Sequence, residues 1–297
     1  MIFNKILISF TLGGLIFASL QAQDSDSILY KQVGSSELYL HVDYPMLYDP
    51  ALSYPAMVFF FGGGWNGGTV EQFAQHALYF ASRGVVCFRA DYRVKNRQGT
   101  SPFESLKDAK SAMRYIRAHA HELGVDPDKI IASGGSAGGQ LAAAAAAVEG
   151  FNEEGEDSTV SCIPNALVLF NPVFDNGPGG YGYERIGDQY KDFSPLHNLK
   201  QGMPPAIVFL GTEDNLIPVE TARYFKTVME KVGSRCELFL YEGEGHGFFN
   251  FRNYEMYVDT RDKAEKFLIS TGFIRDESRY RMGYPVPKPS IAVDSSK

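Results

Sequence analysis

Short runs of apolar residues alternate along the chain with longer segments of mixed polarity. An unbroken apolar run predicts a strand that is covered on both faces. Such runs lie at 56–61, 85–88, 130–132, 166–170 and 206–210, and a further predicted strand at 236–241 is interrupted only by Glu237. The mixed segments that predict helices lie at 70–83, 104–123, 219–232 and 259–270, and the alanine-rich segment 141–148 predicts a helix because alanine is the best helix former. Strands that alternate with helices predict an α/β fold, with a mostly parallel sheet and helices on both faces.

Two further segments depart from this pattern. Residues Glu37 to Tyr44 alternate between polar and apolar positions. A period of two is typical of a half-buried strand, and we expect an antiparallel strand at the sheet edge. By contrast, Asp175 to Leu199 is rich in Gly, Tyr and Pro and has no clear period. We expect this segment to be an irregular insertion.

The composition is that of a globular protein. The chain has 297 residues, of which 44% are hydrophobic and 21% are charged. These values exclude a disordered chain and fit one large α/β domain. The formal net charge of −7 argues against nucleic acid and against an anionic membrane surface as partners.

The two ends of the chain differ from its centre. Lys5 is followed by an apolar stretch from Ile6 to Leu20. Residues 1–22 are therefore predicted to be a secretory signal, with an uncleaved anchor as the alternative. Residues 276–297 are predicted to be a C-terminal tail, which leaves 23–275 as the folded domain. We expect an exported protein, periplasmic or secreted, without stable membrane insertion once the signal is removed.

Ser136 lies in a run of small residues, Gly134-Gly135-Ser136-Ala137-Gly138-Gly139, between a predicted strand and an alanine-rich predicted helix. This placement predicts a sharp strand-to-helix turn, in which glycines allow a close approach of the two elements. A G-x-S-x-G sequence in that position is typical of a nucleophile elbow. A flexible glycine-rich loop is the alternative, and it does not explain the elements on either side.

A second glycine-rich turn follows the predicted strand 56–61 and reads Gly62-Gly63-Gly64-Trp65. Backbone N–H groups in such a turn can point at a substrate oxygen, because no Cβ blocks the approach. We expect the N–H of Gly63 or Gly64 to join that of Ala137, at the start of the predicted helix, in an oxyanion hole. Trp65 is expected to contact the substrate. A hairpin turn would explain the glycines but not Trp65.

Two acids, Glu213 and Asp214, follow the predicted strand 206–210. Asp214 is favoured as a functional residue because the Asn215-x-x-Pro218 that follows resembles the turn carrying the acid in related enzymes. A helix N-cap is the alternative role for either residue.

His246 is the one histidine of six that follows both the acids and the last predicted strand. The order Ser136, Asp214, His246 is that of α/β-hydrolase triads. In such a triad the imidazole removes the proton of the serine during attack, and the aspartate orients the imidazole. The chain has neither a zinc-ligand spacing nor a phosphate loop ending in Lys-Ser or Lys-Thr, so no metal or cofactor is expected.

Taken together, these motifs resemble the α/β-hydrolase carboxylesterases, especially bacterial acetyl-xylan and feruloyl esterases and the hormone-sensitive-lipase-like esterases. The resemblance extends from about Leu38 to Phe273. It implies an α/β-hydrolase catalytic domain and hydrolysis of short acyl esters, on small molecules or on acetylated carbohydrate. The family usually has His before the three glycines and often before the acid turn, where this chain has Phe61 and Leu210.

The resemblance also frames expectations about the substrate pocket. Phe61 and Trp65 are expected to crowd its entry, which favours acetyl over long acyl chains. The Asp175–Leu199 insertion is expected over the site, with Tyr181, Tyr183 and Tyr190 lining a cleft or simply exposed on a loop.

Two other functions share parts of this pattern. A serine peptidase of the prolyl-peptidase type has the same triad order, but no propeller domain precedes this one. A non-catalytic binding module on a hydrolase fold is the other alternative, and the intact Ser, Asp and His argue against it.

Overall fold

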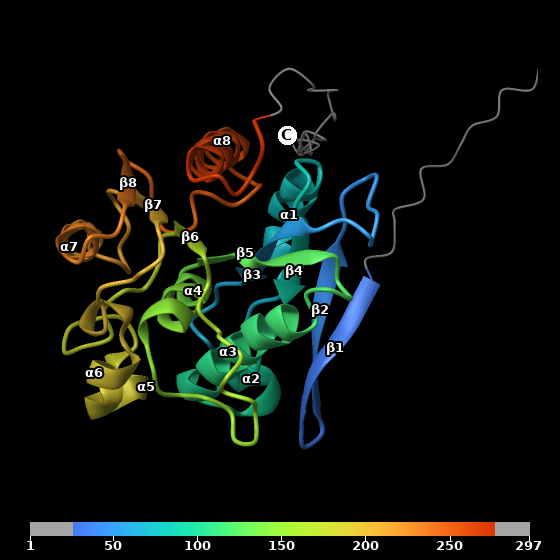
Figure 1. The fold of residues 1–297 in the computed structure, drawn as a ribbon. Coiled ribbons are helices and arrows are strands. Elements are labelled where there is room, and N and C mark those ends of the chain that lie inside the picture. Colours follow the sequence, from blue (N-terminus) through green and yellow to red (C-terminus); the bar gives the residue numbers. More distant parts are fainter. Residues whose placement is uncertain (1–25, 277–297) are drawn as a thin grey trace, which may run out of the picture.

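The computed structural model describes residues 26–276, so the predicted signal and nearly all of the predicted tail lie outside the described residues. One eight-stranded sheet forms the centre, in the order β1-β2-β4-β3-β5-β6-β7-β8 (Figure 1). Its strands are β1 (Asp26–Val33), β2 (Ser36–Asp43), β3 (Tyr54–Phe60), β4 (Val86–Ala90), β5 (Val125–Gly135), β6 (Ala166–Phe170), β7 (Ala206–Gly211) and β8 (Cys236–Tyr241).

The strands from β4 onward in this order run parallel to one another. Strand β2 is antiparallel to both of its neighbours, β1 and β4. The prediction of an antiparallel strand over Glu37 to Tyr44 is therefore confirmed, but its place at the edge is wrong. β1 covers β2 and is itself the edge strand. The apolar pattern missed β1 because only two consecutive residues of this strand, Tyr30 and Lys31, are buried.

Helices cover both faces of the sheet (Figure 1). The longer ones are α1 (Ala74–Ala81), α3 (Pro102–Ala118), α4 (Ala137–Ala147), α7 (Val219–Lys231) and α8 (Tyr254–Ser270). The shorter ones are η1 (Val70–Phe73), α2 (Lys95–Gln98), α5 (Tyr183–Ile186), η2 (Gly187–Gln189), α6 (Tyr190–Phe193) and η3 (Pro195–His197). None of the helices between residues 26 and 276 is both long and apolar enough to span a membrane.

The core divides into two apolar clusters, one on each face. Alternate residues of β3 supply both clusters, because successive side chains of a strand point to opposite faces. Val58 and Phe60 pack with residues of α3, α4 and α7. Met57 and Phe59 pack with residues of α1 and α8. The predicted α/β fold is therefore confirmed, with the carboxyl ends of the parallel strands at one edge of the layer.

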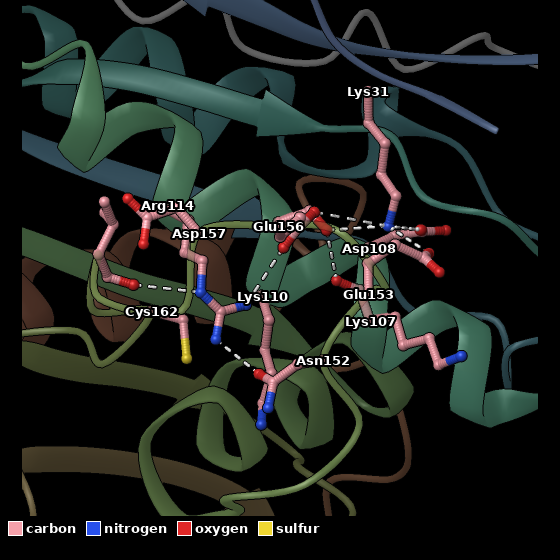
Figure 2. Close-up of polar contacts among 12 residues, drawn as sticks. Lys31, Lys107, Asp108, Lys110, Arg114, Asn152, Glu153, Glu156, Asp157 and Cys162 are labelled. Atoms are coloured by element: carbon pink, nitrogen blue, oxygen red, sulfur yellow. Dashed lines mark hydrogen bonds and ion pairs between the residues drawn. The ribbon is translucent and has the colours of Figure 1, made fainter.

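A cluster of buried charges ties β1 to α3 and to the segment 149–162, and we call it the Lys31 cluster (Figure 2). Lys31 Nζ lies 2.7 Å from a carboxylate oxygen of Asp108 and 2.7 Å from one of Glu153. Arg93 contacts the same two carboxylates, at 2.7 and 2.8 Å. The side chain of Asp108 is completely buried. These four residues define the cluster, and they fasten the edge strand to the body of the domain.

Candidate active site

Ser136 is the single residue between the end of β5 and the start of α4. Its backbone has φ 54° and ψ −118°, which a residue with a side chain rarely adopts. The flanking glycines make the tight turn sterically feasible. A Cβ added at Gly134 would lie 2.4 Å from the backbone of Gly138, and one added at Gly138 would lie 2.0 Å from the Phe60 oxygen. The sequence between 134 and 138 thus folds as a strand-to-helix elbow.

Three side chains from separate loops meet at this elbow. His246 Nε2 lies 3.0 Å from Ser136 Oγ, and His246 Nδ1 lies 2.7 Å from Asp214 Oδ2. Asp214 follows β7 and His246 follows β8, so both reach the serine from the carboxyl ends of parallel strands. The Asp214 side chain is fully buried and that of His246 is 21% exposed. The geometry links a buried carboxylate, an imidazole and a hydroxyl in one hydrogen-bonded chain.

Asp214 rather than Glu213 is the acid that faces His246. Its second oxygen, Oδ1, accepts the backbone N–H groups of Leu216 and Ile217 at 2.9 and 3.0 Å. The carboxylate therefore closes its own turn, and it is not the N-cap of α7, which is Pro218. Glu213 is exposed and meets the neighbouring loop through its backbone N–H.

The glycine turn after β3 lies against the same cavity as Ser136. Gly63 and Gly64 have φ values of 124° and 62°, which are open to glycine and strained for other residues. The N–H of Gly62 is already bonded to Gln72 Oε1 at 2.6 Å. Those of Gly63 and Gly64 have no acceptor among residues 26–276. The N–H of Ala137 is likewise free, as expected at a helix start.

The cavity has a volume of about 300 Å³. Its lining combines amides and glycines with a few apolar side chains: Gly62, Gly63, Gly64, Gln72, Ser136, Asn171, Tyr181, Leu216, His246, Gly247, Phe249 and Asn250. Of the three tyrosines expected from the Asp175–Leu199 segment, only Tyr181 lines it. Within the described part of the chain, no group of three or more His, Cys, Asp or Glu side chains is placed to hold a metal ion.

Trp65 does not touch the cavity, so the expected contact between Trp65 and substrate is a wrong prediction. Its side chain is 1% exposed and packs on Tyr181 and Phe193, with ring centroids 5.8 and 6.2 Å apart. Arg185 covers the indole at 5.2 Å. Burial among rings removes the large apolar indole from water, while its Nε1–H has no hydrogen-bond partner within residues 26–276. Trp65 supports the cavity wall through Tyr181.

Phe61 also lies outside the cavity, so it does not crowd the entry as expected. It is 1% exposed and stacks on Tyr92, with centroids 4.0 Å apart. The Tyr92 hydroxyl donates to the Phe61 carbonyl at 2.6 Å. This pair anchors the start of the glycine turn. Leu216, Phe249 and Tyr181 are the bulky side chains that narrow the cavity instead.

Comparison with known proteins places this arrangement in a family. The sequence pattern of the BD-FAE family matches residues 46–168. The apo form of esterase 2 from Thermogutta terrifontis is 45% identical, with a TM-score of 0.82, over 86% of this chain and 97% of that one. The chain belongs to the α/β-hydrolase carboxylesterases. The expected resemblance to esterases of this fold is thereby confirmed.

Other known members of the family describe its range. Esterase 2 has also been solved with propionate bound, with butyrate bound and phosphorylated by paraoxon. Esterase LipC of Mycobacterium tuberculosis is 28% identical over 67% of this chain and 54% of LipC. An acetylxylan esterase of Xylanibacter ruminicola is 26% identical over 63% of this chain and 39% of that esterase. The chain spans about half the length of the curated relatives it matches.

The sequence analysis overlooked three amides in this carboxylesterase: Gln72, Asn171 and Asn250 all line the cavity. Gln72 Nε2 donates to Asn250 Oδ1 at 3.0 Å, and Asn250 Nδ2 donates to the Gly247 carbonyl at 2.7 Å. The amides thus connect the glycine turn to the loop that carries His246. Only Asn171 had a usable signal, because it directly follows a predicted parallel strand, where functional side chains gather.

Proposed function

We propose that this protein is a serine carboxylesterase that hydrolyses short-chain acyl esters through Ser136, His246 and Asp214. The observation that carries the proposal is a hydrogen-bonded chain of three side chains. His246 Nδ1 lies 2.7 Å from Asp214 Oδ2, and His246 Nε2 lies 3.0 Å from Ser136 Oγ, beside a small cavity. Family membership supports an ester as the bond attacked. The reaction proceeds in two halves through an acyl-enzyme.

In the first half, Ser136 Oγ attacks the ester carbonyl while His246 Nε2 takes the hydroxyl proton. Asp214 holds His246 in the tautomer that leaves Nε2 free, and it stabilises the imidazolium that forms. The carbonyl oxygen becomes an oxyanion. The free N–H groups of Ala137 and of Gly63 or Gly64 stabilise it by donating hydrogen bonds. Each such donor is worth about 2.7–4 kcal/mol in the transition state. The alcohol then leaves with the proton from Nε2.

In the second half, water takes the place of the alcohol and attacks the acyl carbon. His246 Nε2 removes its proton, the bond from carbon to Ser136 Oγ breaks, and the proton returns to Oγ. The acid is released and the hydroxyl is restored.

A short acyl chain suits the cavity. Its volume of about 300 Å³ is at the lower end for ligand sites, and Leu216 and Phe249 narrow it. The binding of propionate and butyrate by the related esterase 2 supports the same range. We expect kcat/KM for p-nitrophenyl esters to fall from acetyl or butyryl to octanoyl. A long apolar pocket would instead gain roughly 0.8 kcal/mol for each methylene, so a steady rise to octanoyl contradicts this part of the proposal.

Acetylated carbohydrate is the natural substrate that we propose, together with export of the protein. The acetylxylan esterase relative supports the first, and the pattern of residues 1–22 supports the second. Acetate release from a panel of acetylated polysaccharides tests the substrate. Mass spectrometry of the native protein tests export, for which we expect a chain that begins near Gln23; an intact Met1 counts against it.

The role of Ser136 is tested by labelling and substitution. A fluorophosphonate probe should label the wild type at Ser136, and Ser136→Ala should lose both label and nearly all esterase activity. Ser82→Ala, at an exposed serine after α1, is the matched control and should keep both. Labelling of another serine overturns the assignment. Cleavage of an aminoacyl-proline amide in preference to esters would favour the peptidase, and no turnover of any substrate would favour a binding module.

A further inference from the structure

Asn171 is a completely buried residue beside Ser136 that the mechanism above does not use. It follows β6 as Ser136 follows β5, because Gly135 and Phe170 are paired in the register of the two strands. The N–H of Ser136 donates to the Phe170 carbonyl at 3.0 Å. Asn171 has φ 34°, in the left-handed region that residues with a side chain seldom occupy. The fold thus holds this residue in a strained conformation at the reaction centre.

The direction of the Asn171 amide follows from its neighbours. Its Oδ1 accepts the backbone N–H of Gly247 at 3.1 Å. A backbone nitrogen can only donate, so the atom that faces it must be the oxygen. The NH₂ group therefore points to the other side, where Nδ2 lies 3.5 Å from His246 Nε2.

This NH₂ group makes no short hydrogen bond within residues 26–276, since its one contact is the 3.5 Å approach to His246 Nε2. The neutral His246 ring has one lone pair at Nε2, and the Ser136 hydroxyl, at 3.0 Å, is better placed to use it. Asn171 lines the cavity together with both residues. An N–H donor that is buried, fixed in direction and poorly used in the resting protein is suited to an acceptor that arrives with the substrate.

We propose that Asn171 is a further catalytic residue, whose Nδ2–H donates to the oxygen of the departing alcohol. This inference rests on the proposed function. The alcohol oxygen must lie within reach of His246 Nε2, which protonates it, and a donor 3.5 Å from Nε2 reaches the same place.

The bond between the acyl carbon and the alcohol oxygen breaks, and its electron pair goes to that oxygen. The proton on His246 Nε2 moves to the oxygen, and Asn171 keeps its own protons throughout. Its N–H stabilises the negative charge that builds up before protonation is complete. In the second half, the attacking water occupies this place and the same N–H orients it.

The benefit of this donor depends on how much charge the leaving oxygen carries. A p-nitrophenolate disperses its negative charge and departs without help. An alkyl or sugar alkoxide concentrates the charge on one oxygen and needs the donor. Removing Asn171 Nδ2–H should therefore slow reaction of alkyl esters by on the order of 10²-fold, as for other preorganised donors, and that of p-nitrophenyl esters only a few-fold.

Two variants and two esters test the proposal. Asn171→Asp keeps an oxygen for Gly247 but loses the donor, and Asn171→Gly accepts the positive φ but loses the amide. We expect both variants to lower kcat/KM for ethyl acetate much more than for p-nitrophenyl acetate, which shares the acyl group. Circular dichroism and fluorophosphonate labelling check that each variant is folded with a reactive Ser136.

Asn250→Ala is the matched control, because Asn250 holds the same loop through the Gly247 carbonyl but has no bond to the reacting groups. The Asn250→Ala variant should lower kcat/KM for both esters by the same factor. An equal fall for both esters in the Asn171 variants, or no fall, overturns the proposal and leaves Asn171 as support for the loop. A wild type that neither hydrolyses the esters nor reacts with the probe would instead refute the proposed function.

Discussion

The carboxylate of Asp214 divides its two oxygens between two tasks. Oδ2 lies 2.7 Å from His246 Nδ1, and Oδ1 accepts two backbone N–H groups of its own loop. The second task fixes the carboxylate, so the first needs no reorganisation. A neighbouring acid in the same loop, Glu213, has neither contact.

We therefore expect Asp214→Asn to reduce kcat by about 10⁴-fold, because an amide favours the wrong tautomer of the histidine. Glu213→Gln is the matched change at the adjacent residue and should be mild. Steady-state kinetics on p-nitrophenyl acetate compares the two. The reverse ranking would transfer the role to Glu213.

Ser136 holds a conformation that costs free energy, since its φ is 54°. A strained residue of this kind costs of order 1–3 kcal/mol, and glycine relieves most of it. We expect Ser136→Gly to be more stable than Ser136→Ala by about 1 kcal/mol in urea unfolding, although both are inactive. At an unstrained position glycine is the less stable of the two by roughly 0.5–1 kcal/mol. That ordinary ranking at position 136 would show that the elbow stores no strain.

At the scale of elements, the elbow depends on how closely β3, β5 and α4 approach. A methyl group at Gly138 would lie 2.0 Å from the Phe60 oxygen, so Gly138→Ala forces the helix away from the sheet. We expect a loss of about 1–3 kcal/mol in the free energy of unfolding, the usual cost of overpacking. Activity should fall by on the order of 10²-fold, because a displacement of about 1 Å misplaces the serine.

Gly150→Ala provides the control for that change. No atom lies within 4 Å of a Cβ added at Gly150, so this substitution should leave both stability and activity unchanged. Equal behaviour of the two variants would mean that the strand and helix can separate without consequence.

The strands that are buried on both faces were predictable from the sequence, because a short continuous apolar run is typical of a strand that is covered on both faces. β3, β6 and β7 lie within or close to their predicted ranges. α4 begins at Ala137 rather than 141, since the elbow turns directly into the helix. β1 was not predictable from its pattern, because its burial depends on Lys31, whose ion partners come from distant parts of the chain.

In the active site, too, the features that depend on local sequence were predictable, and those that depend on contacts with distant segments were not. The meeting of Ser136, Asp214 and His246 was predictable because each lies in a distinctive loop shortly after the end of a strand. The position of Trp65 was not, since its burial depends on Tyr181 and Phe193 from another segment. Asn171 had a signal in its place after a predicted strand, but its approach to Ser136 depends on the register between β5 and β6, which the sequence pattern does not give.

For the whole molecule, the Lys31 cluster is the main polar connection between the edge strand and the body. Removing one member of a buried ion pair leaves the other charge without compensation, at a cost of about 3–5 kcal/mol. We expect Asp108→Asn to lower the free energy of unfolding by that amount. Glu230→Gln makes the same chemical change in the exposed Lys226–Glu230 pair of α7 and should cost about 0.5 kcal/mol or less. Similar losses in the two variants would show that the buried cluster contributes no more than a surface pair.

The cluster also predicts how stability responds to acid. Burial by itself raises the pKa of Glu153, but the hydrogen bond and charge of Lys31, with the charge of Arg93, lower that pKa overall. A carboxyl whose pKa is lower in the folded state stabilises the fold above its unfolded pKa, about 4.3, and this contribution disappears as pH falls through the folded value.

The difference in the free energy of unfolding between wild type and Glu153→Gln should therefore be largest near pH 6. It should shrink below about pH 4, where an ordinary glutamate becomes protonated. Urea unfolding at a series of pH values measures it. A difference that does not change with pH would mean that Glu153 titrates alike in the folded and unfolded chain.

Strand β1 comes first among the strands of residues 26–276, but the residues that hold it come much later. Lys31 Nζ bonds Ser111, 80 residues further on, and the Tyr30 hydroxyl bonds the Asp91 carbonyl, 61 residues further on. Contacts so distant form only after the entropy of closing a long loop has been overcome. A ribosome that is making this protein releases Lys31 long before it releases Glu153. We therefore expect β1, although it is synthesised before the other described strands, to be among the last of them to dock.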